Sequence, residues 1–138
     1  MEEHLVARGH EHVRATHPST LEVTTDQSLT PAGDCIVGVA ADRAPSSFDP
    51  AFVAVARDAD ARVVATIRVG PHEAVVTGRG DPSLTYASDR GAVVRTSTYV
   101  DDRTVLVEAD AAAADLDRHL VQHLQSGAEL EVTLSVDP

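Results

Sequence analysis

The sequence predicts an α+β fold, in which a mainly antiparallel sheet, able to curl into a barrel-like shape, packs against two helices. Short stretches of alternating apolar and polar residues are separated by turn residues, and two segments place apolar residues at helical spacing. No glycine-rich nucleotide fingerprint follows a strand, which disfavours a doubly wound α/β fold. The 138 residues suit a single domain, 1–138.

The first part of the chain predicts three strands. Leu5–Arg8 is typical of a short strand that ends at a glycine. Thr20–Thr24 alternates polar and apolar residues, as a half-buried strand does. After a turn at residues 30–33, Cys35–Ala41 is apolar on both faces and predicts a central strand covered on both sides.

A helix and a hairpin follow. Asp49 is placed to cap the helix, and Pro50 suits the first helical position, where its missing N–H costs nothing. Apolar residues at helical spacing behind Pro50 form the face that the helix buries. Residues 63–69 and 74–77 then predict two antiparallel strands that turn at residues 70–72.

The last part of the chain predicts a second hairpin, a second helix and a closing strand. The hairpin joins residues 92–100 to 104–108, and the helix runs from a cap at Asp110 to Gly127. Residues 130–136 alternate apolar and polar and predict a strand with one wet face. The expected order is therefore β-β-β-α-β-β-β-β-α-β, and no internal repeat is expected.

The charge balance predicts adaptation to high salt. The chain has 22 acidic residues against 11 basic ones, all of them arginine, and its net charge is −11. In molar salt the Debye length falls to roughly 3 Å, which screens such self-repulsion. A GC-rich genome would explain the absence of lysine but not the excess of acid. The composition therefore favours the cytoplasm of a salt-accumulating organism.

Cysteine usage and the termini agree with a cytoplasmic location. Cys35 is the single cysteine, so no internal disulfide can form, which suits a reducing compartment. The N-terminus lacks the basic and apolar regions of a signal peptide, and no apolar run is long enough to span a bilayer. We therefore expect no membrane association.

A group of histidines forms the first candidate site. His10 and His12 are two residues apart, so they share one face of an extended backbone, and His17 could return as a third ligand. Imidazoles in this arrangement predict a divalent transition metal such as zinc, held by His10 and His17. The competing interpretation is that histidines on exposed loops are ordinary and bind nothing.

Asp34 and Cys35 form the second candidate site, at the start of the expected buried strand. A side chain at a strand end is held by a rigid sheet, which suits catalysis. Asp34 is a candidate acid or base, and Cys35 is a candidate nucleophile if His10 or His17 lowers its pKa. The competing interpretation makes Cys35 a small buried apolar residue.

Two further patterns carry weaker signals. Gly78, Arg79 and Gly80 could expose backbone N–H groups beside a cation and so bind an anionic ligand, although turns use the same residues. Asp115, His119 and His123 lie at i, i+4 and i+8 of the second helix and form one stripe, in which the histidine pair has a spacing that can hold a metal. The competing interpretation is that this stripe is a solvated flank of the helix.

Several short motifs are shared with a known family. They are Gly9-His10, Ala15-Thr16-His17, Leu29-Thr30-Pro31, Gly33-Asp34-Cys35-Ile36, Gly78-Arg79-Gly80, Asp102-Arg103-Thr104, Ala109-Asp110 and residues 112–116. Together they resemble the archaeal domain-of-unknown-function family 371 over nearly the whole chain. The resemblance implies an archaeal and, with this composition, a haloarchaeal source. It brings no activity with it, and His12 stands outside the family pattern.

Three functions remain open on the sequence. The first is a small-molecule enzyme or binding protein for an anionic ligand, in which His10, His17 and Asp34 do the chemistry. The second is an RNA- or protein-binding module of archaeal information processing, although the acidic total and the scarcity of aromatics disfavour nucleic acid. The third is a structural role, in which the closing strand pairs through a free edge with another copy to form a homo-oligomer.

The halophilic composition predicts that thermal stability rises strongly with added potassium chloride. The reason is that screening removes the mutual repulsion of the excess carboxylates. Melting curves between low and molar salt test this expectation. A melting temperature that does not respond to salt would contradict it.

Overall fold

The computed structural model describes residues 1–137, and their elements follow the predicted order of strands and helices. They are β1 (Glu2–Arg8), β2 (Thr20–Thr24), β3 (Ile36–Gly38), the 3-10 helix η1 (Pro45–Ser47), α1 (Pro50–Ala56), β4 (Arg62–Val69), β5 (His72–Arg79), β6 (Gly91–Arg95), β7 (Thr104–Leu106), the 3-10 helix η2 (Ala113–Asp115), α2 (Arg118–Gln125) and β8 (Glu129–Asp137). The α+β class is therefore confirmed.

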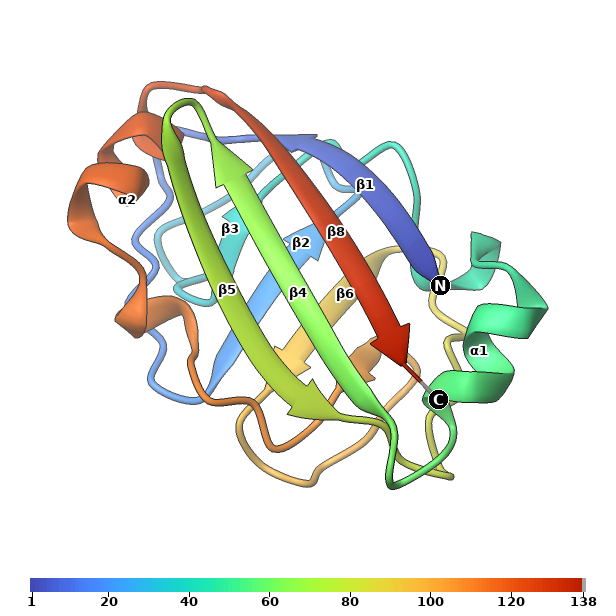
Figure 1. The fold of residues 1–138 in the computed structure, drawn as a ribbon. Helices are drawn as coiled ribbons and strands as arrows, with labels where there is room; N and C mark the ends of the chain where they lie inside the picture. The colour runs from blue at the N-terminus through green and yellow to red at the C-terminus, as the bar shows by residue number, and fades with distance from the viewer. Residues whose placement is uncertain (138) are drawn as a thin grey trace.

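The strands form two four-stranded sheets that face each other (Figure 1). The first sheet has the order β1-β8-β4-β5, and all its neighbouring strands are antiparallel. The second has the order β3-β2-β6-β7, with an antiparallel central pair and two parallel outer pairs. Single bridges from Arg8 to Val39 and from Arg79 to Val107 join the sheets, which do not close into one barrel.

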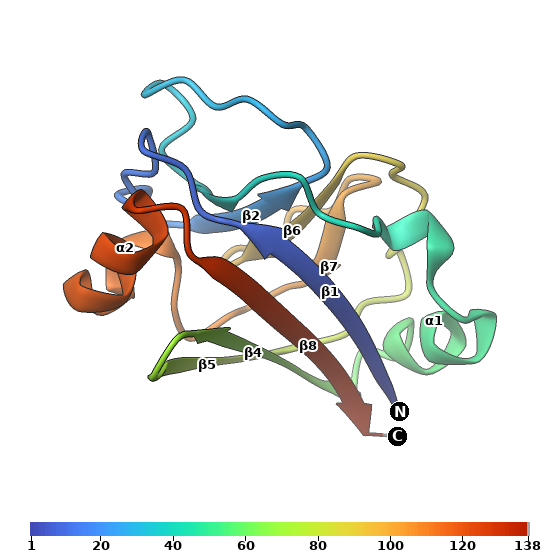
Figure 2. The ribbon, with the colours of Figure 1, turned by 90° about the horizontal axis from the view of Figure 1, so that it is seen from above.

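Aliphatic side chains fill the space between the two sheets, as a chain with so few aromatic residues requires. Leu21 and Val23 of β2 face Ile67 of β4 and Leu134 of β8 across this core. The helices lie at opposite ends of the molecule (Figure 2). The core therefore runs between the sheets and leaves their outer faces to carry polar groups.

The chain contains an internal structural repeat, in which two halves have the same fold. The order of elements from β1 to β4 is reproduced from β5 to β8. Non-glycine residues with positive φ occur at matching places, Ala15 with Tyr86 and Ala40 with Glu108. The expectation of no repeat is therefore wrong. Some matching positions keep the same residue, such as Arg8 and Arg79 or the helix caps Asp49 and Asp117, but most side chains differ, which makes the repeat hard to see in the sequence.

A local two-fold axis relates the two halves. β2 matches β6 and β4 matches β8, and each strand pairs antiparallel with its own counterpart. Glu22 lies directly opposite its counterpart Val93 in one sheet, and Thr66 lies opposite its counterpart Thr133 in the other. The axis therefore passes through the centres of both sheets.

The two halves are interlocked. β1 pairs with β8, and β4 pairs with β8 and β5, so every strand pairing in the first sheet joins one half to the other. Gly9, at the end of β1, packs against the backbone of Leu124 in α2, and its counterpart Gly80 packs against Ala56 in α1. Any side chain at either glycine would collide with that helix backbone. Neither half has a complete sheet of its own.

The central strand expected at Cys35–Ala41 is wrong. Only residues 36–38 form a strand, and β3 lies at the edge of its sheet. Val37 and Val39 are nevertheless buried, because Val39 turns toward β1 and bridges to Arg8. The segment 35–41 is apolar on both faces because it lies where the two sheets meet. It is not in the middle of one sheet.

The second hairpin is also wrong. β6 and β7 are parallel neighbours, since residues 96–103 carry the chain back to the starting end of β6 before β7 begins. β-Propensity is high on both sides of the Asp101–Asp102 turn, so the sequence pattern favours two adjacent strands but gives no direction for their pairing. Val100, expected within a strand, lies in the connecting loop.

The second helix begins later than expected. Asp117 caps it, with its Oδ1 accepting a hydrogen bond from the backbone N–H of His119 at 2.7 Å. Asp110 instead accepts from the N–H of Thr77 at 2.9 Å, and the alanines that follow it lead into η2. Helix propensity is overridden here because the backbone and side chain of Asp110 are held against β5 by hydrogen bonds with Thr77.

The closing strand has no free edge. β8 is an interior strand between β1 and β4, and the edges of its sheet are β1 and β5. The wet face expected for β8 is present, because Glu129 and Glu131 are exposed on the outer face. Self-association through a free edge of β8 is therefore wrong.

Separate expression of residues 1–70 and 71–138 should give two chains that do not fold alone. Each half keeps one strand pair of its own, β2–β3 or β6–β7, and lacks the partners of its other strands, so each exposes unpaired backbone and apolar surface. Mixing the halves should restore cooperative unfolding and a dispersed amide NMR spectrum. A monomeric half with a dispersed spectrum would contradict the interlocked arrangement.

Candidate functional site

His10 and His17 both cap turns of the loop between β1 and β2. The Nδ1 atom of His10 accepts from the backbone N–H of His12 at 3.0 Å. The Nδ1 atom of His17 accepts from the N–H groups of Ser19 at 3.2 Å and Thr20 at 3.1 Å. The Nδ1 atom of each ring is therefore engaged in closing a turn of its own loop.

The second half of the chain performs the same capping with other side chains. Asp81, the counterpart of His10, accepts from the N–H of Ser83 at 2.9 Å. Ser88, the counterpart of His17, accepts from the N–H groups of Arg90 and Gly91. Since aspartate and serine fill these places equally well, the fold needs only a hydrogen-bond acceptor there.

Asp34 contacts the loop around His17 through its backbone carbonyl and not through its carboxylate. Its carbonyl oxygen accepts from the N–H groups of Thr16 at 3.0 Å and His17 at 3.3 Å. No hydrogen bond or ring contact joins His10 to His17 or Asp34 within residues 1–137. The ring of His10 instead lies against that of His12, with centroids 5.2 Å apart. No group of three or more histidine, cysteine or acidic side chains stands in metal-binding geometry in this part of the chain.

Arg79 is already paired. Its Nε lies 2.8 Å from the carboxylate of Glu108, and its Nη1 donates to the carbonyl of Gly80 at 2.9 Å and lies 3.3 Å from Asp81. The backbone N–H groups of Arg79, Gly80 and Asp81 donate to carbonyls of Val107, Ala61 and Ala56. The loop therefore holds the sheets and α1 together, and these donors are not available to an anion.

Gly78 serves close packing in the same region. A Cβ atom at this position would meet the carbonyl oxygen of Val107 and the side chain of Leu106. The glycine therefore allows β5 to approach the chain that follows β7. The Gly78-Arg79-Gly80 pattern, which suggested an exposed anion-binding loop, therefore lies where β5 packs closely against α1 and the chain that follows β7.

A cluster of charged side chains lies on the outer face of the second sheet, at the two-fold axis. Glu22 of β2 is at its centre, with only 11 % of its side chain exposed. The Sγ atom of Cys35 donates to Oε1 of Glu22 at 3.7 Å, and Nη1 of Arg103 lies 3.5 Å from the same oxygen. Glu22 and Cys35 thus form one site, with Arg103 as its cation.

A second ion pair supports this cluster. Arg95 of β6 donates to Asp101 at 2.9 Å and to the buried hydroxyl of Thr104 at 2.9 Å. Asp101 also lies 3.2 Å from Nη2 of Arg103 and accepts from its backbone N–H at 3.0 Å. These bonds fix the position of Arg103, so the guanidinium beside Glu22 is held by its neighbours and not by Glu22 alone.

Burial raises the pKa values of the carboxyl groups of Glu22 and Asp101, and the neighbouring arginines lower them. Burial raises the pKa of Glu22, and this effect exceeds the lowering by Arg103 and by the hydrogen bond from Cys35. Burial opposes ionisation of Asp101 as well, but hydrogen bonds from Arg103 and the charge of Arg95 lower its pKa overall. Glu22 is therefore a carboxyl group suited to taking up a proton.

The same surroundings make Cys35 a poor nucleophile. Burial raises the pKa of the thiol, and the nearby Glu22 carboxylate raises it further. A nucleophilic cysteine needs the opposite shift, because the thiolate is the reactive form. The structure therefore gives Cys35 the role of a donor to Glu22.

A hollow of about 320 Å³ opens beside Glu22. It is lined by Glu22, Thr24, Asp26, Ile36, Ser88, Arg90 and Arg103. Gly91 leaves room for the carboxylate, since a Cβ atom there would lie 2.5 Å from Oε2 of Glu22. The hollow thus combines a partly buried carboxyl group with two guanidinium groups that reach the solvent.

Sequence analysis missed Glu22 and Asp101 as site residues. Glu22 fits the alternating pattern of β2 as an ordinary wet-face residue, and its burial comes from loops of both halves. The one available signal was Asp102-Arg103-Thr104, a motif shared with the family that lies next to Asp101. Its function depends on a sheet pairing that the sequence does not reveal.

Comparison with known proteins decides the family. The family described as Domain of unknown function (DUF371) matches residues 5–137. The chain belongs to this family. It is also 35 % identical over 130 residues to the uncharacterized protein MJ0206 of Methanocaldococcus jannaschii, which covers 94 % of this chain and 96 % of that protein.

This DUF371 protein has an archaeal relative across almost its full length, so the family resemblance seen in the sequence is confirmed. Neither helix in residues 1–137 has the length and apolar character that a membrane span requires.

Ionisation of Glu22 should make stability depend on pH. A carboxyl group whose pKa is raised in the folded state favours the fold most below its unfolded pKa, and this contribution is lost as pH rises through the folded pKa. We expect Glu22→Gln to reduce this loss of stability between weakly acidic and neutral pH. Urea unfolding at constant potassium chloride concentration measures the effect.

Glu11→Gln is the matched control, because Glu11 is exposed and its replacement removes the same charge. The control should keep the pH profile of the unmodified protein. If Glu22→Gln and Glu11→Gln give the same profile, Glu22 does not carry the raised pKa.

Proposed function

We propose that this DUF371 protein binds a small anionic molecule in the hollow beside Glu22. The observation that carries the proposal is a carboxyl group in the floor of a concave site, with the guanidinium of Arg103 held next to it by Asp101. Largely enclosed clefts with a few convergent polar groups and a perturbed carboxyl are the usual form of a ligand site.

The two arginines in the hollow supply the attraction for an anion. The side chain of Arg103 is 46 % exposed and that of Arg90 is 74 % exposed, so both reach the solvent. Arg90 is paired with Asp26 through two contacts, at 3.0 and 2.9 Å. A carboxylate or phosphate would share these guanidinium groups through charge-assisted hydrogen bonds.

Glu22 adds selectivity to this site. In its protonated form it donates a hydrogen bond to the bound group, and in its ionised form it repels an anion. The protonated form of Glu22 therefore favours an anion that also offers a hydrogen-bond acceptor. The acid or base role first assigned to His10, His17 and Asp34 is better suited to Glu22, because both histidines use Nδ1 within their own loop.

The alternative of nucleic-acid binding has less support. Within residues 1–137, six of the eleven arginines form ion pairs with carboxylates: Arg43, Arg68, Arg79, Arg90, Arg95 and Arg103. Pairing of this kind reduces the positive potential that phosphate backbones require. RNA binding therefore remains a prediction without a structural argument of its own.

An NMR titration tests the proposal. Inorganic phosphate and succinate are added separately to the ¹⁵N-labelled protein at constant ionic strength, and the amide signals of Thr24, Ser88 and Arg103 are followed. We expect saturable shifts with at least one anion. Arg103→Gln should weaken that binding about tenfold or more, the effect of losing a hydrogen bond to a charged group.

Arg68→Gln is the matched control, because Arg68 is an exposed arginine paired with Glu73 on the other sheet. It should leave the affinity unchanged. Equal loss in Arg68→Gln and Arg103→Gln would indicate a general charge effect and contradict the site. Absence of saturable shifts with both anions would also overturn the proposal.

A further inference from the structure

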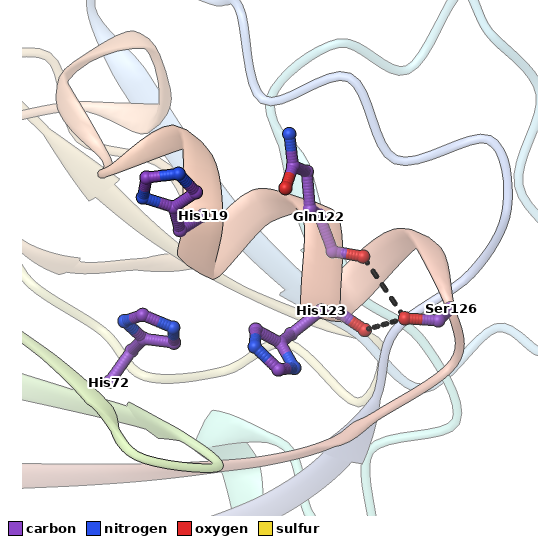
Figure 3. Close-up of a pocket in the computed structure, with 5 residues that line it drawn as sticks. All are labelled: His72, His119, Gln122, His123 and Ser126. Atoms are coloured by element: carbon purple, nitrogen blue, oxygen red, sulfur yellow. Dashed lines mark hydrogen bonds between the residues drawn. The ribbon is translucent and has the colours of Figure 1, made fainter.

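Three histidines gather at the end of the molecule that carries α2, away from the Glu22 hollow. His119 and His123 lie one turn apart on α2, and His72 begins β5 after the turn from β4. Together with Gln122 and Ser126 they line a shallow pocket (Figure 3). The sequence showed the helical pair, and the fold adds His72 from a different element.

His72 and His123 are already close enough to share a ligand. Their ring centroids are 4.9 Å apart, with an angle of 53° between the ring planes. Two imidazoles bound to one metal ion through nitrogens at 2.0–2.1 Å place their ring centroids roughly 5 Å apart. The observed separation therefore matches that of two ligands on a single ion.

The backbone that carries these rings is firmly held. The hydroxyl of Ser126 donates to the carbonyls of Gln122 at 3.1 Å and His123 at 3.0 Å, which closes the last turn of α2 (Figure 3). At the other end of the helix, Oδ1 of Asp117 lies 3.5 Å from Nδ1 of His119. Both side chains are exposed, so this weak contact does not prevent the ring of His119 from turning toward the other two histidines.

The internal repeat shows that the fold does not require these histidines. The positions of α1 that match His119 and His123 are occupied by Ala51 and Val55. Helix α1 packs in the same way without an imidazole on that face. The histidines of α2 therefore add a property that the framework alone does not demand.

We propose that His72 and His123 bind a divalent transition-metal ion of the Zn²⁺, Ni²⁺ or Cu²⁺ class, with His119 as the third ligand. The three side chains do not stand in three-ligand geometry in residues 1–137, so His119 completes the site by rotating its exposed side chain. Water fills the remaining coordination position. Neutral imidazole is a preferred ligand for these ions, and the net charge of −11 favours their approach.

Calorimetric titration of the full chain with Zn²⁺ tests the site. We expect one ion per chain, and we expect His72→Asn and His123→Asn each to weaken its binding at least tenfold. Long-range ¹H–¹⁵N NMR should show the nitrogen signals of His72, His119 and His123 shifting together on addition of Zn²⁺. Failure to bind Zn²⁺ at micromolar concentration would overturn the proposal.

The double variant His10→Asn with His12→Asn is the control, because these two rings form the other close histidine pair, at 5.2 Å. It should bind Zn²⁺ like the unmodified protein. If this control loses the ion and His123→Asn keeps it, the ion belongs to the β1–β2 loop and the proposal is wrong. Unchanged melting temperatures of all variants without metal would separate loss of ligands from loss of fold.

Discussion

The pairing of each half of the chain with strands of the other half is the constraint on which the structure depends. β4 and β8 pair antiparallel at the centre of one sheet, and β2 and β6 do the same in the other. A small chain with little aromatic surface gains a continuous core by this exchange, since each half supplies two strands to each sheet. The glycines at residues 9 and 80 matter for the same reason, because they let one half approach the helix of the other.

The local two-fold axis also explains where a polar site can arise. At the axis a residue faces its own counterpart, so a difference between the two halves produces one asymmetric site. Glu22 faces Val93 there, and Cys35 corresponds in the repeat to Arg103. A carboxylate and its cation therefore come from opposite halves and meet on one outer face. The inward-facing residues of the same strands stay apolar, and the core is left undisturbed.

Capping of loops accounts for motifs that first suggest chemistry. Arg8-Gly9-His10 and Arg79-Gly80-Asp81 are two copies of one structural device, in which a strand ends, a glycine meets a helix and an acceptor closes the turn. His17 and Ser88 are a second such pair. Residues of these kinds are easily mistaken for ligands, because the polar atoms that close a turn are the ones that bind metals and substrates.

The sequence by itself determined the fold class, the order of elements, the N-terminal cap of α1 and the family, because these follow from local periodicity, from turn chemistry and from short motifs. Tertiary structure alone decided the direction of β7, the interior place of β8 and the later start of α2, since each depends on contacts with segments that are not adjacent in the sequence. It also decided the candidate site. Glu22 is buried, and Arg103 lies beside it, only after strands from both halves have come together, and no local pattern records a contact between residues so far apart in the chain.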